Sequence, residues 1–336
     1  MGKKKKLNPG VRLMSVVKAN AYGHGAVAIA QAVIKEGTSC LGVLNVTEAL
    51  ELREAGISAP IVLLSPPLPT EAAAVVRYRL EPTVDSHESA KALDRAAQKP
   101  VPIHVDVDSG LRRWGLPVSE LPGFLRKLRH LKKLRLAGLS THIDYVPGKN
   151  AVEAEMKLRR FQRLATWVRA ERPGAACHAA NSSILMDFPR WQMQMARIGN
   201  LLYGINPASI ETRLKDPWRF LARIIAISHA GKGQAIGYAG EFIAPSRMTL
   251  ATLPVGYADG LTMEPAERFI GLGRRFRYWG ILREIEAPIV GRCAISHVLM
   301  DISRIPRARI GDVVCLPVRR TAASPRIPRL YTGNPG

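Results

Sequence analysis

A lysine precedes a polar turn rich in glycine in the stretch Ser15-Val-Val-Lys-Ala-Asn-Ala-Tyr-Gly-His-Gly25. Small and apolar residues lead into Lys18, which predicts a buried strand that ends at the lysine. Burial at a strand end disfavours the charged form of an amine, so the pKa falls and the neutral amine becomes available for Schiff-base chemistry. The alternative is a lysine that extends its charged end from a strand into solvent.

Four further groups of polar residues follow short apolar runs. They are Val105-Asp-Val-Asp-Ser-Gly-Leu-Arg-Arg-Trp-Gly115, Ser140-Thr-His-Ile-Asp144, His178-Ala-Ala-Asn-Ser-Ser183 and Met195-Ala-Arg-Ile-Gly-Asn200. Two carboxylates such as Asp106 and Asp108 can hold a metal ion, but nothing nearby in the sequence completes a ligand set, so we expect no metal site. Polar residues mark loop starts in many proteins. Repeated groups of this kind nevertheless favour one shared site.

Alternating strands and helices must position these groups. The candidate strands are Arg12–Ala19, Cys40–Asn45, Pro60–Ser65, Leu80–Asp85, Val101–Asp108, Leu134–His142, Cys177–Ala180 and Met193–Gly199. The candidate helices are Ala26–Glu36, Thr47–Ala55, Thr70–Arg77, His87–Gln98, Glu120–His130 and Ala151–Arg169, with Thr47 and Thr70 as expected N-caps. This alternation predicts an α/β fold, a (β/α)8 TIM-type barrel, rather than an open doubly wound sheet. Catalytic residues of such barrels gather at the carboxyl ends of the strands, where all these polar groups fall.

After Pro207 the sequence changes to short aliphatic runs broken by glycine and proline, which predicts a mostly β domain. Its candidate strands are Ala222–His229, Met248–Pro254, Ala287–Val290, Val298–Ile302 and Val313–Val318. We therefore expect a basic N-terminal stub at 1–10, the barrel at 11–218, and a C-terminal β domain at 219–336 that ends in an irregular tail.

The chain is strongly basic, with 49 Lys and Arg against 27 Asp and Glu and a formal net charge of +22 over 336 residues. Such a charge can indicate a nucleic-acid or membrane partner. Here the arginines are scattered and no aromatic residues alternate with them, so we expect no nucleic acid and no membrane as partner. No apolar segment follows Lys3–Lys6, so no signal peptide is expected. The four cysteines are far apart and form no CxxC pair, which favours a reduced, cytoplasmic setting.

The motifs resemble those of alanine racemases, enzymes that use pyridoxal phosphate (PLP). Val16-Val-Lys-Ala-Asn-Ala-Tyr-Gly-His-Gly25 resembles the cofactor-lysine motif of that family. Gln234-Ala-Ile-Gly-Tyr238 resembles its tyrosine-containing turn, and Leu253-Pro-Val-Gly-Tyr257-Ala-Asp-Gly260 its Gly-Tyr-Ala-Asp-Gly signature. The resemblance implies a PLP-binding barrel followed by the β domain. It also implies a racemase that interconverts L- and D-alanine and supplies D-alanine for peptidoglycan.

Racemisation removes a proton from one face of the α-carbon and returns one to the other, so two opposed bases suffice. By resemblance, Lys18 serves the D-face, and Tyr238 serves the L-face from the other subunit of a head-to-tail homodimer. A free tyrosine, with a pKa of about 10, is a poor base at neutral pH, so a cation must favour its phenolate. The resemblance gives this role, and the substrate carboxylate, to Arg113, with Arg112 as the alternative by register. The backbone N–H of Ile295 is expected to meet the same carboxylate.

The resemblance also implies how the cofactor is held. His142 would belong to the hydrogen-bond network under the cofactor ring. Arg197 would face the pyridine nitrogen, where an arginine cannot give a proton and leaves the ring a weaker electron sink. Ser182 and the backbone N–H groups after Gly199 would bind the phosphate, as turns from a strand into a helix do. The expected cofactor-binding residues are Lys18, Tyr22, His142, Ser182, Arg197, Gly199, Asn200 and Tyr257.

Several positions depart from the family pattern. The Gly-Arg-Ile-Cys-Met-Asp segment reads Gly291-Arg-Cys-Ala-Ile-Ser296, so Ala294, Ile295 and Ser296 replace a cysteine, a methionine and an aspartate. Pro317 stands where a phosphate-binding tyrosine is usual, with Arg319 or Arg320 as substitutes. Only 17 residues precede Lys18, where the family has an opening strand and helix, so we expect either that this unit is missing or that the start of the chain is misassigned.

Asp106 occupies the position of a lysine that often carries a carbamate, and its carboxylate can supply the same negative charge directly. Two alternatives to an alanine racemase follow from the departures. One is a racemase of serine or another amino acid, and the other is a non-catalytic or degraded PLP-binding homologue.

Overall fold

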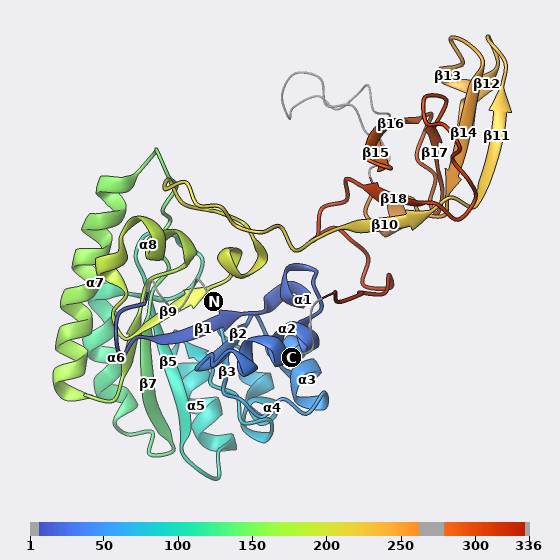
Figure 1. Cartoon of the computed structure of the whole chain (residues 1–336). Helices are drawn as coiled ribbons and strands as arrows, with labels where there is room; N and C mark the ends of the chain where they lie inside the picture. The colour runs from blue at the N-terminus through green and yellow to red at the C-terminus, as the bar shows by residue number, and fades with distance from the viewer. Residues whose placement is uncertain (1–6, 262–278, 333–336) are drawn as a thin grey trace. The chain divides into compact units, whose positions relative to one another are not determined.

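The computed structural model describes residues 7–261 and 279–332, and the chain divides into two compact units, 1–217 and 218–336 (Figure 1). Residues 1–6 of the expected N-terminal stub and the last four residues of the expected tail lie outside the described residues. Within the described ranges, no helix is long and apolar enough to cross a membrane.

The first unit is an α/β barrel of parallel strands, which confirms the predicted fold. Its strands are β1 (Arg12–Val16), β2 (Cys40–Val43), β3 (Ile61–Leu63), β4 (Thr83–Val84), β5 (Val101–Asp108), β7 (Leu134–Ser140), β8 (Ala176–His178) and β9 (Met195–Ile198), with a short β6 (Leu116–Pro117) paired to β5. Two runs of neighbours, β3-β2-β1-β9 and β4-β5-β7-β8, form its wall. An isolated parallel β-bridge between Val62 and Glu81 joins β3 to the segment just before β4. A 2.8 Å hydrogen bond from the Arg197 N–H to the Ala180 carbonyl joins the other two ends.

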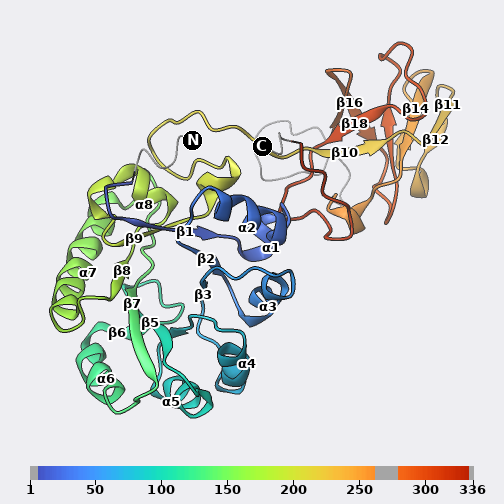
Figure 2. The ribbon, with the colours of Figure 1, turned by 60° about the horizontal axis from the view of Figure 1, so that its bottom comes forward.

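Helices cover the outside of these strands (Figure 2). They are α2 (Ala26–Lys35), α3 (Val46–Glu54), α4 (Ala72–Arg77), α5 (His87–Ala96), α6 (Leu121–Leu128), α7 (Ala151–Glu171) and α8 (Ser182–Asp187), with 3-10 turns η2 (Pro69–Glu71), η3 (Val118–Glu120), η4 (Pro189–Trp191) and η5 (Asn200–Tyr203). Both predicted N-caps were wrong. Asn45 caps α3, because its extended backbone brings its side-chain oxygen to 3.0 Å from the Glu48 N–H. Thr70 lies inside η2, before α4 begins.

Strand β5 shows how the barrel separates its core from its site. Ile103, Val105 and Val107 are fully buried in the main apolar core. The residues between them, His104 and Asp106, are also buried but make polar contacts with side chains of β7 and β8 or the loop before β4. Because successive strand residues point to opposite sides, one face of β5 packs against the helices and the other lines the barrel interior.

The second unit is built on an antiparallel sheet with strand order β10-β18-β15-β16-β17-β14-β11 among the described residues. The strands are β10 (Phe220–Arg223), β11 (Ala226–Ala230), β14 (Met248–Leu253), β15 (Trp279–Leu282), β16 (Ile285–Val290), β17 (Val298–Asp301) and β18 (Val313–Leu316). A separate pair, β12 (Ala235–Ile236) and β13 (Phe242–Ile243), is joined by the turn η6 (Tyr238–Gly240), and η7 (Tyr257–Asp259) follows β14. The predicted mostly β domain is confirmed.

Candidate active site

Lys18 begins a left-handed turn directly after β1, labelled α1 (Lys18–Tyr22). The next four residues, Ala19 to Tyr22, all have φ between 52° and 56°. Left-handed backbone costs roughly 1–2 kcal/mol for each residue with a side chain, so contacts from elsewhere in the fold must hold the turn. In the middle of the turn the Asn20 Oδ1 accepts a 2.7 Å hydrogen bond from the N–H of Ala26, the first residue of α2. The predicted strand therefore ends at Val16, earlier than expected.

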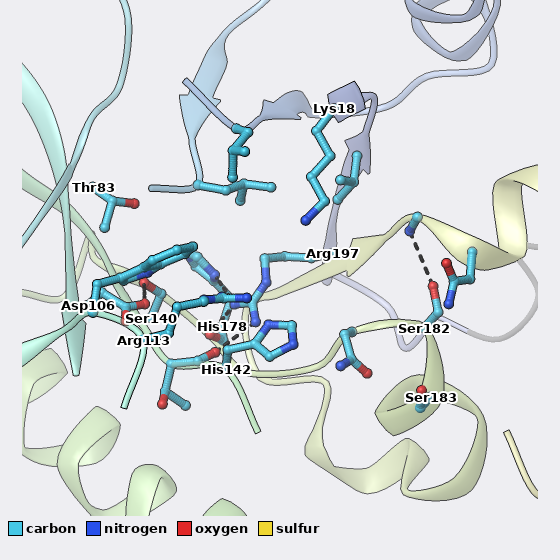
Figure 3. Close-up of a pocket in the computed structure, with 18 of the residues that line it drawn as sticks. Lys18, Thr83, Asp106, Arg113, Ser140, His142, His178, Ser182, Ser183 and Arg197 are labelled. Atoms are coloured by element: carbon cyan, nitrogen blue, oxygen red, sulfur yellow. Dashed lines mark hydrogen bonds between the residues drawn. The ribbon is translucent and has the colours of Figure 1, made fainter. Parts of the chain in front are cut away.

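A cavity of about 270 Å³ opens at the carboxyl ends of the barrel strands. Its lining includes all eight residues of the first unit that the sequence assigned to the site: Lys18, Tyr22, Arg113, His142, Ser182, Arg197, Gly199 and Asn200. Figure 3 shows the Lys18 side chain extending into this cavity toward Arg197, with His142 and Arg113 close by.

The cavity is electrostatically positive around the lysine. Burial lowers the pKa of Lys18, and the charges of Arg113 and Arg197 lower it further, while Glu48 raises it. Burial and the same two arginines lower the pKa of His142 to about 3, which keeps this imidazole neutral at physiological pH. The neutral amine of Lys18, which Schiff-base chemistry requires, is thus easier to form than that of an exposed lysine.

Arg197 is the best anchored cation of the site and is 7% exposed. Its guanidinium donates at 2.7 Å to the backbone carbonyls of Thr141 and His178, and at 2.6 Å it contacts the Nδ1 of His178. Burial lowers its pKa to about 10, partly offset by Asp106, so the side chain stays cationic at neutral pH. These bonds fix the guanidinium rigidly in the cavity.

A chain of hydrogen bonds continues from Arg197 through the barrel interior. His178 Nε2 lies 2.9 Å from His104 Nδ1, and His104 Nε2 lies 3.1 Å from the Glu81 carboxylate. An arginine can only donate, so Nδ1 of His178 accepts and its Nε2 carries the proton. His178 Nε2 then donates to Nδ1 of His104, so the proton of His104 is on Nε2 and is donated to the Glu81 carboxylate. The His178 imidazole is then neutral, which agrees with the strongly lowered pKa that burial and Arg197 give it.

Asp106 supplies a negative charge that interacts with both site arginines. Ser140 donates a 2.6 Å hydrogen bond to its Oδ2. Burial raises the pKa of Asp106 to about 6, against the opposing effects of Ser140, Arg197 and Arg113. The Arg113 guanidinium carbon lies 3.7 Å from the ring centroid of Trp114, which holds it by a cation–π contact.

The opposite end of the cavity has hydroxyl and backbone donors suited to an anion. Ser182 begins α8, and its Oγ accepts a 3.2 Å hydrogen bond from the Gly199 N–H. A Cβ at Gly199 would lie 2.5 Å from the Tyr22 hydroxyl, so only glycine lets Tyr22 approach this turn. Tyr22 is held in place by a stacked contact with the Tyr203 ring, at 4.6 Å between centroids. The Tyr203 hydroxyl in turn donates at 2.8 Å to the Val16 carbonyl.

The remaining predicted site residues lie in the second unit, where one loop brings them together. The carbonyl of Ala294, next to Ile295, accepts a 3.0 Å hydrogen bond from the Tyr257 N–H. His297 lies further along the same loop, with its ring 6.2 Å from that of Tyr238. Tyr238 is 62% exposed and Ile295 is 57% exposed, so neither is packed into its own unit.

The sequence did not predict the residues that hydrogen-bond to the cavity side chains from behind. The sequence gives His178 a place in a motif but no role, and it assigns none of Ser140, His104 and Glu81 to the site. The alternation of β5 contained a signal, because His104 lies two residues before Asp106 and so shares its face. No such signal exists for Glu81, whose contact with His104 spans neighbouring strands.

A cavity at the carboxyl ends of barrel strands, lined by a desolvated lysine and two arginines, is typical of barrel enzymes that use a lysine amine in their chemistry. Residues 3–207 match the model of the alanine racemase N-terminal domain, and residues 218–328 match that of its C-terminal domain. The chain therefore belongs to the alanine racemase family, whose members use PLP.

Individual relatives agree with this assignment. An alanine racemase of Syntrophobacter fumaroxidans is 34% identical over 93% of this chain and 83% of its own. The structure of alanine racemase from Bacillus anthracis with bound L-Ala-P has a TM-score of 0.82 at 26% identity, covering 93% of this chain and 80% of its own. Alanine racemase from Clostridium difficile in complex with cycloserine has a TM-score of 0.81 at 25% identity, with 93% and 81% coverage.

Proposed function

We propose that this chain is a PLP-dependent racemase that interconverts L- and D-alanine in the cytoplasm and supplies D-alanine for peptidoglycan. The observation that carries the proposal is the joint placement of Lys18, Arg197 and the Ser182–Gly199 turn around one cavity in a chain of this family. Relatives solved with L-Ala-P and with cycloserine support a small amino acid as substrate.

The residues present fit PLP. The cavity offers an amine for the aldehyde in Lys18, a buried cation for the ring nitrogen in Arg197, and a hydroxyl and backbone turn for the phosphate at Ser182, Gly199 and Asn200. Tyr22 approaches the same turn, and His142 would lie by the ring. Tyr257 completes the proposed cofactor set. When bound, PLP supplies an electron sink for the pair left behind by the α-proton.

This chain's own residues move the proton. By resemblance to the family we assign Lys18 as the base on the D-face, and burial and the site arginines lower the pKa of its amine. Tyr238 of the partner subunit is assigned to the L-face. Arg113 and the backbone N–H of Ile295 would hold the substrate carboxylate and so fix which face of the α-carbon each base meets.

The dimer is part of the proposal because the two bases come from different copies. Tyr238 and Ile295 are exposed at the surface of the second unit, as expected for residues that complete another subunit's site. A head-to-tail pair would give two such sites for each dimer.

The proposal is tested with purified full-length protein. We expect an absorbance band near ~420 nm that borohydride fixes on Lys18, and exchange of the α-proton of alanine with solvent. Tyr238→Phe should keep the band and lose racemisation, whereas Lys18→Ala should lose both. A protein that shows the band but exchanges no α-proton of alanine, serine or lysine is a binding homologue, and the racemase assignment then fails.

A second candidate substrate is favoured by the loop of Ile295. Ala294, Ile295 and Ser296 replace the cysteine, methionine and aspartate of the family segment, at the position assigned to the substrate carboxylate. Serine or a longer amino acid then becomes the alternative substrate. The ratio of kcat/KM for alanine to that for serine and lysine decides between them.

A further inference from the structure

Glu48, on α3, uses both carboxylate oxygens to bind backbone N–H groups. Its Oε1 accepts from the N–H of Ala19 at 2.8 Å, and its Oε2 accepts from the N–H of Leu44 at 2.7 Å. Its own N–H donates at 3.0 Å to the capping oxygen of Asn45. One side chain thus joins the turn after β1 to the end of β2 and to the first turn of α3.

The Ala19 N–H belongs to the peptide group that follows Lys18, so Glu48 holds that peptide plane. Ala19 is also the first of the four left-handed residues, and nothing in its own side chain favours that conformation. On the other side of the lysine, the Val17 N–H donates at 2.8 Å to the carbonyl of Gly42. The backbone on both sides of Lys18 is therefore fixed by bonds to β2 or α3.

Glu48 also affects the charge around the lysine. Arg113 follows β5, Arg197 lies on β9 and His142 follows β7, and each interacts electrostatically with the Lys18 amine. Both arginines lower the pKa of Lys18, whereas Glu48 raises it. The lysine thus lies between cations inside the cavity and one carboxylate behind the turn.

We propose that Glu48 is a positioning residue for Lys18, which holds the peptide plane after the lysine and so sets the direction in which its amine enters the cavity. The inference deepens the proposed function, since it gives a supporting residue to the proposed cofactor lysine. It does not depend on which amino acid is racemised.

Three variants separate the geometric effect from the charge. Glu48→Ala removes both hydrogen bonds and the charge, and Glu48→Gln keeps one acceptor and removes the charge. Glu51→Gln is the control, because Glu51 is an exposed carboxylate on the same helix. Thermal unfolding establishes that each variant is folded, and Glu48→Gln carries the test if Glu48→Ala does not fold.

The first measurement is amide hydrogen exchange at Ala19 and Leu44 in the full-length protein. We expect at least tenfold faster exchange at both amides in Glu48→Ala, faster exchange at one of them in Glu48→Gln, and no change in Glu51→Gln. Unchanged exchange in both Glu48 variants would overturn the proposal even if the wild-type protein racemises alanine. Faster exchange stands as support even if alanine is not the substrate.

The second measurement is the PLP dissociation constant as a function of pH. Loss of the Glu48 charge lowers the pKa of Lys18, so the pH below which PLP affinity falls should move downward in both Glu48 variants. The highest affinity reached at any pH should drop at least tenfold in Glu48→Ala, because the amine is no longer oriented. The same shifts in Glu51→Gln, or none in either Glu48 variant, would contradict the positioning role.

Discussion

At the scale of single residues, the site depends on how charge is balanced around Arg113 and Arg197. Asp106 is the buried carboxylate whose charge acts on both guanidinium groups. Its ordinary pKa of 3.8 rises to about 6, because burial outweighs the Ser140 hydrogen bond and the two cations. The carboxylate is therefore ionised at neutral pH and becomes neutral in mildly acidic solution.

This titration predicts an acidic limb in the activity profile. As the pH falls through about 6, Asp106 takes up a proton and Arg113 loses its fixed counter-charge, so kcat/KM should decline. Asp106→Asn should be roughly tenfold less active at pH 8, about 1.4 kcal/mol of transition-state stabilisation, and should lack this limb. The measurement is kcat/KM between pH 5 and 9. An equally steep limb in the variant would show that another group causes it.

Many of the residues that line the cavity were predictable from the sequence. The residues that hold these lining residues in place were not. Lys18, Arg197 and Ser182 stand in motifs at predicted strand ends, which favoured one shared site, and the family resemblance supplied the role of each. Glu48 and Glu81 reach the site through contacts across neighbouring elements. Such pairings depend on the register of the folded barrel, which no local pattern encodes.

At the scale of elements, the alternation of strands and helices predicted the barrel, because the apolar spacing of each strand or helix can be recognised within a short stretch of sequence. The N-caps failed because α3 begins two residues earlier and α4 one residue later than expected, which changes the side chain that reaches the free N–H groups. Strands β12 and β13 are each two residues long, which is too short for an alternation of apolar and polar residues to be recognised. The left-handed turn was also missed, because Ala19 and Ala21 ordinarily favour right-handed helix.

The loop after β5 depends on a glycine. At Gly115, φ is +104°, and a Cβ would lie 2.8 Å from both the Asp106 Oδ1 and the Asp108 backbone nitrogen. Gly115→Ala should lower the free energy of unfolding by about 2–3 kcal/mol, from backbone strain plus steric overlap. The control is Gly148→Ala, with φ of +77° and no atom within 4 Å of the added Cβ, which should cost about 1 kcal/mol. Denaturant titration compares them, and equal losses would contradict the steric argument.

At the scale of the whole molecule, the proposed catalyst is shared between two copies of the chain. The first unit holds the Lys18 cavity, and the second holds Tyr238 in η6, Tyr257 in η7 and Ile295 in the loop between β16 and β17. The assignment of Tyr238 to the partner's site therefore makes dimer formation a condition for activity.

Mixing two inactive variants tests this arrangement. In a heterodimer of Lys18→Ala and Tyr238→Phe, one site has both substitutions and the other has neither. Random assortment in an equal mixture makes half the dimers mixed, so racemisation should recover to about a quarter of the wild-type rate after subunit exchange. Each variant mixed with itself is the control. No recovery, with exchange of subunits confirmed by mass spectrometry, would place both bases in one chain.

The left-handed turn has one further consequence, which concerns chirality. A φ near +52° is strained for an L-residue but is the relaxed right-handed geometry seen in a mirror, so it suits a D-residue. Ala19 is exposed, which leaves room for the methyl group of the opposite configuration. A semisynthetic chain with D-alanine at position 19 should therefore keep the turn and gain stability. The backbone conformation beside Lys18 would then be favoured by D-alanine, which is also a product of the proposed reaction.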